Sequence, residues 1–269
     1  MFAEERQQLI SELVAERGRV SVTDLADRFS ITTETVRRDL AVLESAGNIR
    51  RVHGGAVPSD RLSTREESVV ERAVQRQPEK LRIAEAALAL IPENRAGSIL
   101  IDAGSTTEAL ARLLGQRAQT NASANGKPAD EELVVITHAI PIAGQLTGHP
   151  HIALHILGGR VRGLTQAAVG QSTVDAASRL RPDIAFVGAN GIHATFGLST
   201  PDPEEAAVKA AFVTSARRVV VLADSSKLDA ETLVQFAALK DVDTVITDHE
   251  PSEELSAALA EAGVDVVVA

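Results

Sequence analysis

Polar side chains follow several apolar runs of this 269-residue chain, at the points where each run gives way to a turn. The first cluster is Asp102–Thr107, directly after an apolar run that ends at Ile101. A Gly-Ser-Thr-Thr turn that opens a helix offers free backbone N–H groups, hydroxyls and the positive end of a helix dipole, which together bind anions. The spacing of Ser105 and Glu108 also fits a capping box, which needs no ligand.

Similar clusters of glycines, hydroxyls and cations follow later apolar runs, and the carboxyl ends of parallel strands are where small ligands bind. Arg160, Lys209 and Lys227 are the cations of greatest interest, because the region around them is otherwise acidic. Each cluster alone fits ordinary turn chemistry. The candidate ligand-binding residues are Asp102, Ser105, Thr106, Thr107, Thr137, His138, Gly158, Gly159, Arg160, Gly188, Asn190, Gly191, Lys209, Asp224, Ser225, Ser226 and Lys227.

The elements that must position these residues alternate between strand-like runs and helical patterns. Helical segments include Thr106–Leu114, Glu204–Ala216 and a helix that Pro78 opens. Such alternation predicts an α/β domain with a mainly parallel sheet over residues 78–269. The predicted strands are Ser98–Asp102, Leu133–Thr137, Ile152–Gly158, Ile184–Gly188, Arg218–Ala223, Asp243–Thr247 and Val264–Val268.

Two polar stretches interrupt this pattern. Residues 58–77 are charged and show little periodic apolar signal, so we interpret them as a linker that can be partly helical. Residues 116–132 carry small and polar side chains and are interpreted as a surface insertion. The chain therefore divides into a domain over 1–57, a linker over 58–77 and a domain over 78–269.

The first 57 residues are predicted to form three helices followed by a hairpin. Ile10, Leu13 and Val14 have helical spacing in the first segment. Thr23 and Thr33 are suitable caps for the second and third helices. In the third, Val36, Leu40 and Leu43 recur at intervals of three and four residues. Residues 49–52 and 54–57 can pair as a two-stranded wing, which completes a winged helix-turn-helix.

Hydroxyls and arginines cluster on the first turns of the third helix and on the wing. A helix in the major groove of DNA needs donors that reach base edges or phosphates from one face. The net charge is −10, which taken alone argues against nucleic acid, but four arginines and only two acids lie between Val36 and His53. The candidate DNA-binding residues are Thr33, Thr35, Arg37, Arg38, Arg50, Arg51 and His53. The acid Asp39 is expected to orient a neighbouring arginine or to act as a cap within the fold.

Residues 6–57 resemble the DeoR-type helix-turn-helix almost continuously. The resemblance rests on Thr35-Val36-Arg37-Arg38-Asp39-Leu40 and on Arg51-Val52-His53-Gly54-Gly55-Ala56. It implies double-stranded operator DNA as a partner. Pairs of half-sites in such operators imply a homo-oligomer.

Residues 78–248 resemble the C-terminal sensor domain of the DeoR family. The matching pieces include Ile101–Thr107, Leu157-Gly158-Gly159, Glu205 with Lys209, and Asp224–Lys227. The resemblance implies a fold related to ribose-5-phosphate isomerase and coenzyme A transferases, with a phosphorylated sugar as effector. The candidate ligand-binding residues then become candidate effector-binding residues. Two further stretches, 159–165 and 197–201, are similar to fructose-operon repressors and point to a fructose phosphate.

The predicted function is therefore repression of sugar catabolism genes, relieved by a phosphorylated sugar. Two alternatives stay open. A sugar-phosphate isomerase could use Asp102, Asp224 and Lys227 for proton transfer and charge stabilisation. A DNA-architectural protein would need no effector at all.

Composition excludes several other classes. The chain has no cysteine, so thiolate metal sites and a cysteine nucleophile are excluded. His149, His151 and His155 flank an apolar run without a nearby carboxylate cluster, so no metal site is predicted. The sequence contains no convincing dinucleotide motif, and no cofactor or catalytic residue is predicted. The N-terminus is unlike a signal peptide and apolar runs are short, so we expect a cytoplasmic protein without a membrane partner.

Overall fold

A computed structural model of the chain describes residues 3–46, 49–52, 54–58, 66–91, 97–125, 132–149 and 151–269. Its contacts divide the chain into two compact units, Met1–Arg65 and Glu66–Ala269. The predicted linker reached residue 77, whereas the second unit already begins at Glu66. The reason is packing, because Val69 is buried and its amide donates to the carbonyl of Leu164 at 2.9 Å.

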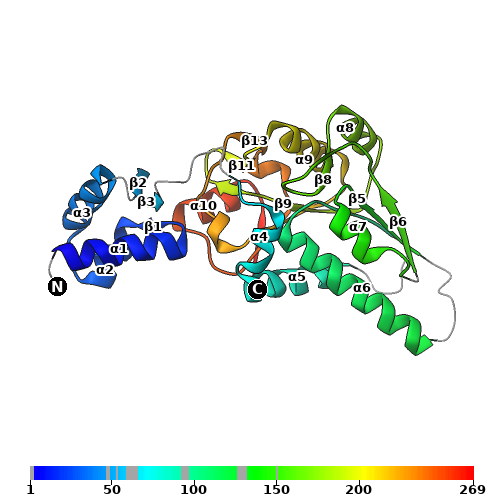
Figure 1. The fold of residues 1–269 in the computed structure, drawn as a ribbon, viewed down its shortest axis with the longest axis horizontal. Coiled ribbons are helices and arrows are strands. Elements are labelled where there is room, and N and C mark those ends of the chain that lie inside the picture. The colour runs from blue at the N-terminus through cyan, green and yellow to red at the C-terminus, as the bar shows by residue number, and fades with distance from the viewer. Residues whose placement is uncertain are drawn as a thin grey trace. The chain divides into compact units, whose positions relative to one another are not determined.

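The first unit is helical with a small sheet, as the sequence predicted (Figure 1). Its described strands pair antiparallel in the order β1-β3-β2, so the predicted hairpin gains a third strand. Apolar side chains from all three helices meet in one buried cluster. The elements are α1 (Ala3–Arg17), β1 (Val20–Ser21), α2 (Val22–Phe29), α3 (Thr33–Ser45), β2 (Ile49–Val52) and β3 (Gly55–Pro58).

Both predicted helix caps in this unit are wrong. The cap of α2 is Ser21, whose hydroxyl accepts from the amide of Asp24 at 2.9 Å. The cap of α3 is Thr32, whose hydroxyl accepts from the amide of Thr35 at 3.2 Å. Each helix begins near two hydroxyl residues, and the sequence does not show which of them is the cap. The cap is the first of the two, because its backbone is extended, whereas the second already lies in the helix.

The second unit is built on a seven-stranded sheet with the order β15-β14-β12-β9-β4-β5-β6, and all of its described neighbours run parallel. Each of the strands predicted from the sequence forms one strand of this sheet, so the mainly parallel α/β fold is confirmed. The strands are β4 (Gly97–Ile101), β5 (Leu133–Thr137), β6 (Ile152–Ile156), β9 (Ile184–Gly188), β12 (Val219–Leu222), β14 (Thr244–Thr247) and β15 (Asp265–Val268).

Helices cover both faces of this sheet, as Figure 1 shows. Successive residues of a strand point to opposite faces, so Phe186 of β9 packs in one cluster and Val187 in the other. The first face is covered by α5 (Gln77–Ala89), α6 (Ser105–Asn125) and α7 (Ile140–Leu146). The second is covered by α8 (Gln171–Ser178), α9 (Pro203–Ser215) and α10 (Glu253–Glu261).

Two features of this unit differ from the sequence prediction. Helix α6 continues to Asn125, so residues 116–125 are helical rather than a surface insertion, and residues 126–131 lie outside the described residues. Short elements between the main strands were not predicted, because runs of three or four residues carry little periodic signal. They are β7 (Arg160–Arg162), β8 (Ala167–Val169), β10 (Gly191–His193), β11 (Gly197–Thr200), η1 (Ser225–Lys227), β13 (Val234–Ala237) and η2 (Leu239–Asp241). Helix α4 (Val69–Val74) lies in the segment interpreted from the sequence as a linker that can be partly helical.

In the part of the chain that the structure describes, every helix is too short or too polar to cross a bilayer.

Candidate functional site

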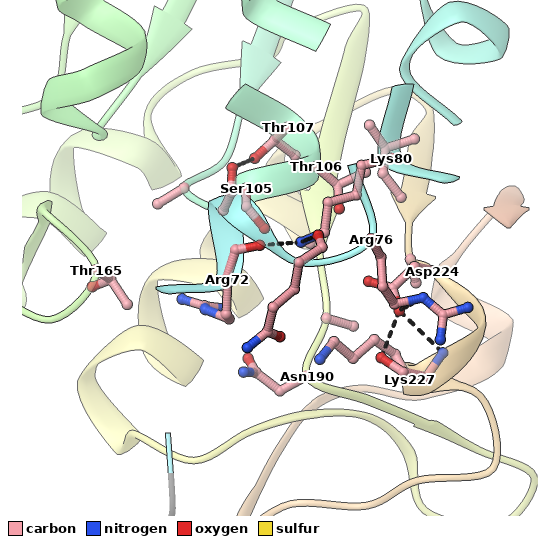
Figure 2. A pocket seen from close by; sticks show the side chains of 18 of the residues that line it. Arg72, Arg76, Lys80, Ser105, Thr106, Thr107, Thr165, Asn190, Asp224 and Lys227 are labelled. Carbon is pink, nitrogen blue, oxygen red and sulfur yellow. Dashed lines mark hydrogen bonds and ion pairs between the residues drawn. The ribbon is translucent and has the colours of Figure 1, made fainter. Parts of the chain in front are cut away.

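A pocket opens in the second unit at the carboxyl ends of β4, β9 and β12 (Figure 2). Parallel strands place the turns that follow them at one edge of the sheet, so residues far apart in sequence meet there. The structure brings together predicted residues from four segments of the chain. Those that line the pocket are Ser105, Thr106, Thr107, Gly188, Asn190, Lys209, Asp224, Ser226 and Lys227.

The amino terminus of α6 forms one wall of the pocket, with Ser105 as the first residue of the helix. Gly104 before it has a φ of 154°, a conformation that residues other than glycine rarely adopt. The capping box that the spacing suggested is not the arrangement found, because Ser105 is already helical. The carboxylate of Glu108 instead accepts from Nε2 of Gln145 at 2.9 Å. Ser105, Thr106 and Thr107 of this first turn line the pocket, at the end of the helix where unpaired backbone N–H groups can bind an anion.

Asp102 lies beneath this wall and is fully buried. Its carboxylate accepts from the ammonium of Lys209, and also from the amide of Gly188 at 2.9 Å. Nε2 of His138 lies 3.0 Å from Oδ1 of the same carboxylate. Burial alone would raise the pKa of Asp102, but Lys209 and His138 outweigh it and lower that pKa to about 2. The carboxylate thus stays charged and holds the turn after β4 against the turn after β9.

Asp224 plays a similar part on the opposite wall, at the start of η1. Its carboxylate accepts from the amide of Ser226 at 3.1 Å, and Nε of Arg76 lies 3.5 Å from Oδ1. Burial opposes ionisation, yet Lys227, Ser226 and Arg76 together lower the pKa of Asp224. Arg76 also donates through Nη2 to the hydroxyl of Ser225 at 2.6 Å. Arg76, which directly precedes α5, therefore connects that segment to the residues of η1.

Sequence reasoning missed the cations that precede and open α5. Arg72, Arg76 and Lys80 line the pocket, although they belong to the predicted linker or to the helix after it (Figure 2). The ammonium of Lys80 is buried and donates to the carbonyls of Arg72 and of Gln75, the latter at 2.9 Å. Burial lowers the pKa of Lys80 to about 8, against a smaller opposing effect of Asp224. The signal that could have found them is their spacing, because Arg72, Arg76 and Lys80 recur at every fourth residue.

A buried acidic residue, Glu205, lines the pocket from the first turn of α9. Its carboxylate accepts from the hydroxyl of Thr165, and from Nη1 of Arg162 at 3.2 Å. The same nitrogen of Arg162 lies 2.7 Å from Oε2 of Glu66. Two buried carboxylates therefore share one guanidinium, and Asn190 adds an amide to this end of the pocket. Paired carboxylate and amide groups suit the hydroxyls of a sugar.

Other predicted residues lie outside the pocket lining. Thr137 is buried and donates to the carbonyl of Ile101 at 2.7 Å, while His138 supports Asp102 from below. Arg160 is exposed and paired with Glu204. Ser225 is held by Arg76 and Asp248.

The glycines at 158, 159 and 191 also lie outside the lining. A side chain at Gly159 would meet Thr173 Oγ1 at 2.1 Å, and one at Gly191 would meet the carbonyl of Ala230 at 2.4 Å. Close backbone packing accounts for both of these glycines. Nothing in the described structure lies within 4 Å of a side chain built at Gly158, whose carbonyl accepts from the hydroxyl of Thr173 at 2.9 Å.

In the first unit, helix α3 presents an exposed basic face. Arg37 and Arg38 are exposed, with side-chain fractions of 63% and 80%. Each lies 3.8 Å from a carboxylate oxygen of Glu34, a distance at which a solvated pair contributes little. Thr33 is exposed as well, whereas Thr35 is half-buried and shares its hydroxyl with Thr32 at 2.9 Å.

The wing presents Arg50 and Arg51, both exposed, on β2. The amide of Arg51 donates to Oε1 of Glu44 at 2.8 Å, which fixes the wing to the end of α3. Gly55 approaches β1 so closely that a side chain there would lie 2.0 Å from the carbonyl of Val20. The candidate His53 falls outside the described residues.

Asp39 does not face outward with the arginines of α3. It is buried, and its carboxylate accepts from Nε of Arg6 at 2.6 Å and from Nε2 of Gln7 at 3.0 Å. Asp39 does orient an arginine, but this is Arg6 of α1 and not a sequence neighbour of Asp39 as predicted. The pair holds α1 against α3 and so supports the exposed face.

A helix-turn-helix unit with exposed arginines, joined to an α/β unit with a cationic pocket, defines a ligand-responsive DNA-binding regulator. Family comparison gives the particular family. The model of the DeoR-like helix-turn-helix domain matches residues 6–61, and that of the DeoR C terminal sensor domain matches residues 75–249. The chain belongs to the DeoR family of helix-turn-helix transcriptional regulators, as the sequence predicted.

Relatives of similar length support this assignment. The chain is 34% identical to the HTH-type transcriptional regulator GlpR of Haloferax volcanii, over 99% of this chain and 98% of that protein. It is 32% identical to a regulator named FruR of Bacillus subtilis, over 93% of each. It is 30% identical to the glycerol-3-phosphate regulon repressor of Escherichia coli, over 92% and 91%.

Among solved structures, ribose 5-phosphate isomerase A from Methanocaldococcus jannaschii is similar at 22% identity and a TM-score of 0.40. The match covers 56% of this chain and 54% of that one. The likeness is partial, so the fold assignment rests on the observed strand order and on the family match.

The isomerase alternative does not fit these findings. It required Asp102 to exchange protons with a substrate, but this carboxylate is fully buried and paired with Lys209. The family is one of transcriptional regulators and not of enzymes, as the sequence predicted.

Proposed function

We propose that this chain represses genes of sugar catabolism and leaves its operator when a phosphorylated sugar binds the pocket. The observation that carries the proposal is the pocket itself, where the amino terminus of α6 and several cations converge at the strand ends. A phosphate group needs N–H donors and positive charge, and both are present. The Escherichia coli relative is named a glycerol-3-phosphate regulon repressor, which supports a phosphorylated effector.

In this proposal the first turns of α3 enter the major groove. Thr33, Thr35, Arg37 and Arg38 contact base edges and phosphates there, because the amino-terminal end of a recognition helix enters the groove deepest. The wing residues Arg50, Arg51 and His53 contact phosphates or the minor groove. A homo-oligomer in the cytoplasm places two such helices on repeated half-sites.

The effector lies with its phosphate at Ser105, Thr106 and Thr107, near Lys80. Its hydroxyls face Asn190 and Glu205 at the other end of the pocket. The resemblance of residues 159–165 and 197–201 to fructose-operon repressors favours a fructose phosphate as the sugar.

Fluorescence anisotropy of the full chain on DNA from upstream of its own gene tests this function. The titrants are fructose 1-phosphate, fructose 6-phosphate, glucose 6-phosphate and glycerol 3-phosphate at fixed salt, since salt alone changes such affinities. We expect nanomolar to submicromolar binding that one titrant abolishes. Tight binding that every titrant leaves unchanged would contradict the effector part of the proposal. Failure to bind any of this DNA specifically would contradict the repressor part.

A further inference from the structure

We call residues Glu66–Gln77 the connector, because they follow directly after the first unit, which ends at Arg65. The connector contains α4, whose start is fixed by a capping box between Ser68 and Glu71. It packs into the second unit through the buried side chain of Val69. The part of the chain that continues from the DNA-binding unit is therefore also part of the pocket wall.

The cations of the pocket differ in how firmly their present partners hold them. Lys209 donates to Asp102 and to the carbonyl of Gly188. Lys80 donates to two carbonyls, and Arg76 contacts Ser225, Asp224 and Asp248. A ligand would have to break these contacts to recruit any of the three.

Arg72 is held more loosely than these. Its Nη2 lies 3.6 Å from Oε1 of Glu66, which is longer than a hydrogen bond. Its Nε is buried and has no hydrogen-bond partner among the residues that the structure describes. A buried donor left unpaired is costly. Nε of Arg76 has no hydrogen-bond partner in this part of the chain either, but Arg76 donates through Nη2 to Ser225 and Asp248. The guanidinium of Arg72 therefore has more to gain from an anion in the pocket that it lines.

We propose that Arg72 is an effector-binding residue supplied by the connector, and that the effector's phosphate replaces Glu66 as its partner. The proposal rests on the function proposed above, in which the effector is a phosphorylated sugar. A phosphate accepts two parallel hydrogen bonds from one guanidinium, which the pair at 3.6 Å does not provide. The effector then touches the segment that leads to the DNA-binding unit, not only the sheet edge.

The exchange changes the charge balance around Glu66. Burial and the carboxylate of Glu205 raise the pKa of Glu66, while Arg72 and Arg162 oppose that rise. When Arg72 turns to phosphate, Glu66 and Glu205 are left with Arg162, which also pairs with Asp202 at 3.1 Å. Glu66 then has weaker compensation for its buried charge, so the contact that holds the first residue of the connector is weakened. A shift there moves the point from which the DNA-binding unit extends.

The test uses the full chain, calorimetric titration and two kinds of probe. One probe is inorganic phosphate, and the other is the set of four sugar phosphates used for the operator. The variants are Arg72→Gln, Arg72→Lys and Glu66→Gln. The matched control is Arg179→Gln, since Arg179 is exposed at the end of α8 and outside the pocket lining.

We expect Arg72→Gln to weaken phosphate and sugar-phosphate binding by about tenfold or more, and Arg72→Lys to recover part of that loss. Glu66→Gln removes the competitor for Arg72, so it should tighten phosphate binding by about threefold. A residue that only supports the fold would not give tighter binding when its partner is neutralised. Effector-bound Glu66→Gln should also release operator DNA less completely than the unmodified chain.

Each outcome decides between distinct claims. If the unmodified chain binds sugar phosphates and Arg72→Gln binds them equally well, the role of Arg72 is wrong and the proposed function stands. If the unmodified chain binds neither phosphate nor any sugar phosphate, both proposals are wrong. Where Arg72→Gln fails to fold, as thermal melting would reveal, Glu66→Gln decides, because unchanged or weaker phosphate binding there contradicts the exchange.

Discussion

The two units use the same residue types in opposite environments. Arg38 on α3 is 80% exposed and has only a long pair with Glu34. Lys209 in the pocket is 5% exposed and fully engaged with Asp102. An exposed cation is free to move and can attract the phosphates of DNA. A buried cation holds its neighbours in place, and leaving it without a counter-charge destabilises the fold.

The comparison teaches that net charge is a poor guide to partners in this chain. A protein of net charge −10 still presents arginines on α3 and the wing, because its DNA-binding unit is nearly neutral. The acids of the second unit neutralise its cations in the interior. Substitutions in the pocket should therefore change stability most, and those on α3 should change DNA binding without changing stability.

The largest effect is expected for Asp102→Asn, which leaves Lys209 buried without its counter-charge. Breaking a buried pair from one side costs about 3–5 kcal/mol, which should lower the melting temperature by roughly 10 °C. Thermal melting of the full chain measures this, with Asp175→Asn at an exposed position of α8 as the control. Equal melting of the two variants would contradict the role given to Asp102.

The pH dependence of the same site has a defined sign. The pKa of Asp102 is lowered in the folded chain to about 2, so its charge stabilises the fold above the unfolded pKa of about 4. That stabilisation is lost as pH falls toward 2. Asp102→Asn should therefore lose less stability than the unmodified chain between pH 5 and pH 3, which acid melting curves measure.

The double change Arg37→Ala with Arg38→Ala should weaken operator binding by about 1–3 kcal/mol for each of the two arginines that pairs with a base. If an arginine contacts phosphate instead, its loss should reduce the slope of log affinity against log salt concentration by about one. Stability should change by less than about 0.5 kcal/mol, since both side chains are exposed. Anisotropy at several salt concentrations checks this against Arg181→Ala in the second unit. Loss of sugar-phosphate binding in the double variant would contradict the assignment of DNA binding and sugar-phosphate binding to separate units.

A smaller effect is expected from Lys80 as pH rises. Burial lowers its pKa to about 8, so it is charged at pH 7 and mostly neutral at pH 9. The charged form favours an anion in the pocket, so the affinity for a sugar phosphate, which is already a dianion at pH 7, should fall by about threefold to tenfold over that range. The side chain in Lys80→Arg stays charged, so the affinity of this variant should not depend on pH over the same range. A flat profile in the unmodified chain would show that Lys80 does not contribute to the anion site.

The smallest effect is expected for Arg160→Gln. Arg160 was a leading candidate in the sequence, but it is exposed, paired with Glu204 and outside the pocket lining. We expect sugar-phosphate affinity to change by less than about twofold, because exposed pairs contribute little. Calorimetric titration measures it, and a tenfold loss would contradict the placement of the effector in a pocket that Arg160 does not line.

The main sheet was predictable because buried parallel strands form continuous apolar runs, and each predicted run is one of its strands. Strand ends also located the pocket, through Ser105, Asn190 and Lys227. The direction of a side chain was not predictable. Thr137 ends its strand as Ile101 does, but its hydroxyl points into the sheet and satisfies the carbonyl of that residue.

The connector was the main omission, for a physical reason. Two of its charged side chains, Glu66 and Arg72, are largely buried in ion pairs and do not face solvent, although Glu67, Glu71 and Gln75 are exposed. Hydropathy does not separate these two cases. Only the fold brings Arg162 and Glu66 together, since they lie far apart along the chain.

The most direct test of the account is the affinity of the full chain for its sugar phosphate, measured with and without saturating operator DNA. If the effector lowers operator affinity, operator must lower effector affinity by the same factor, because coupling between sites is reciprocal. The account predicts weaker effector binding on DNA, by about tenfold or more, with the loss reduced in Glu66→Gln. Equal affinities in both conditions would contradict it and leave a DNA-binding unit and a sugar-phosphate pocket that do not communicate.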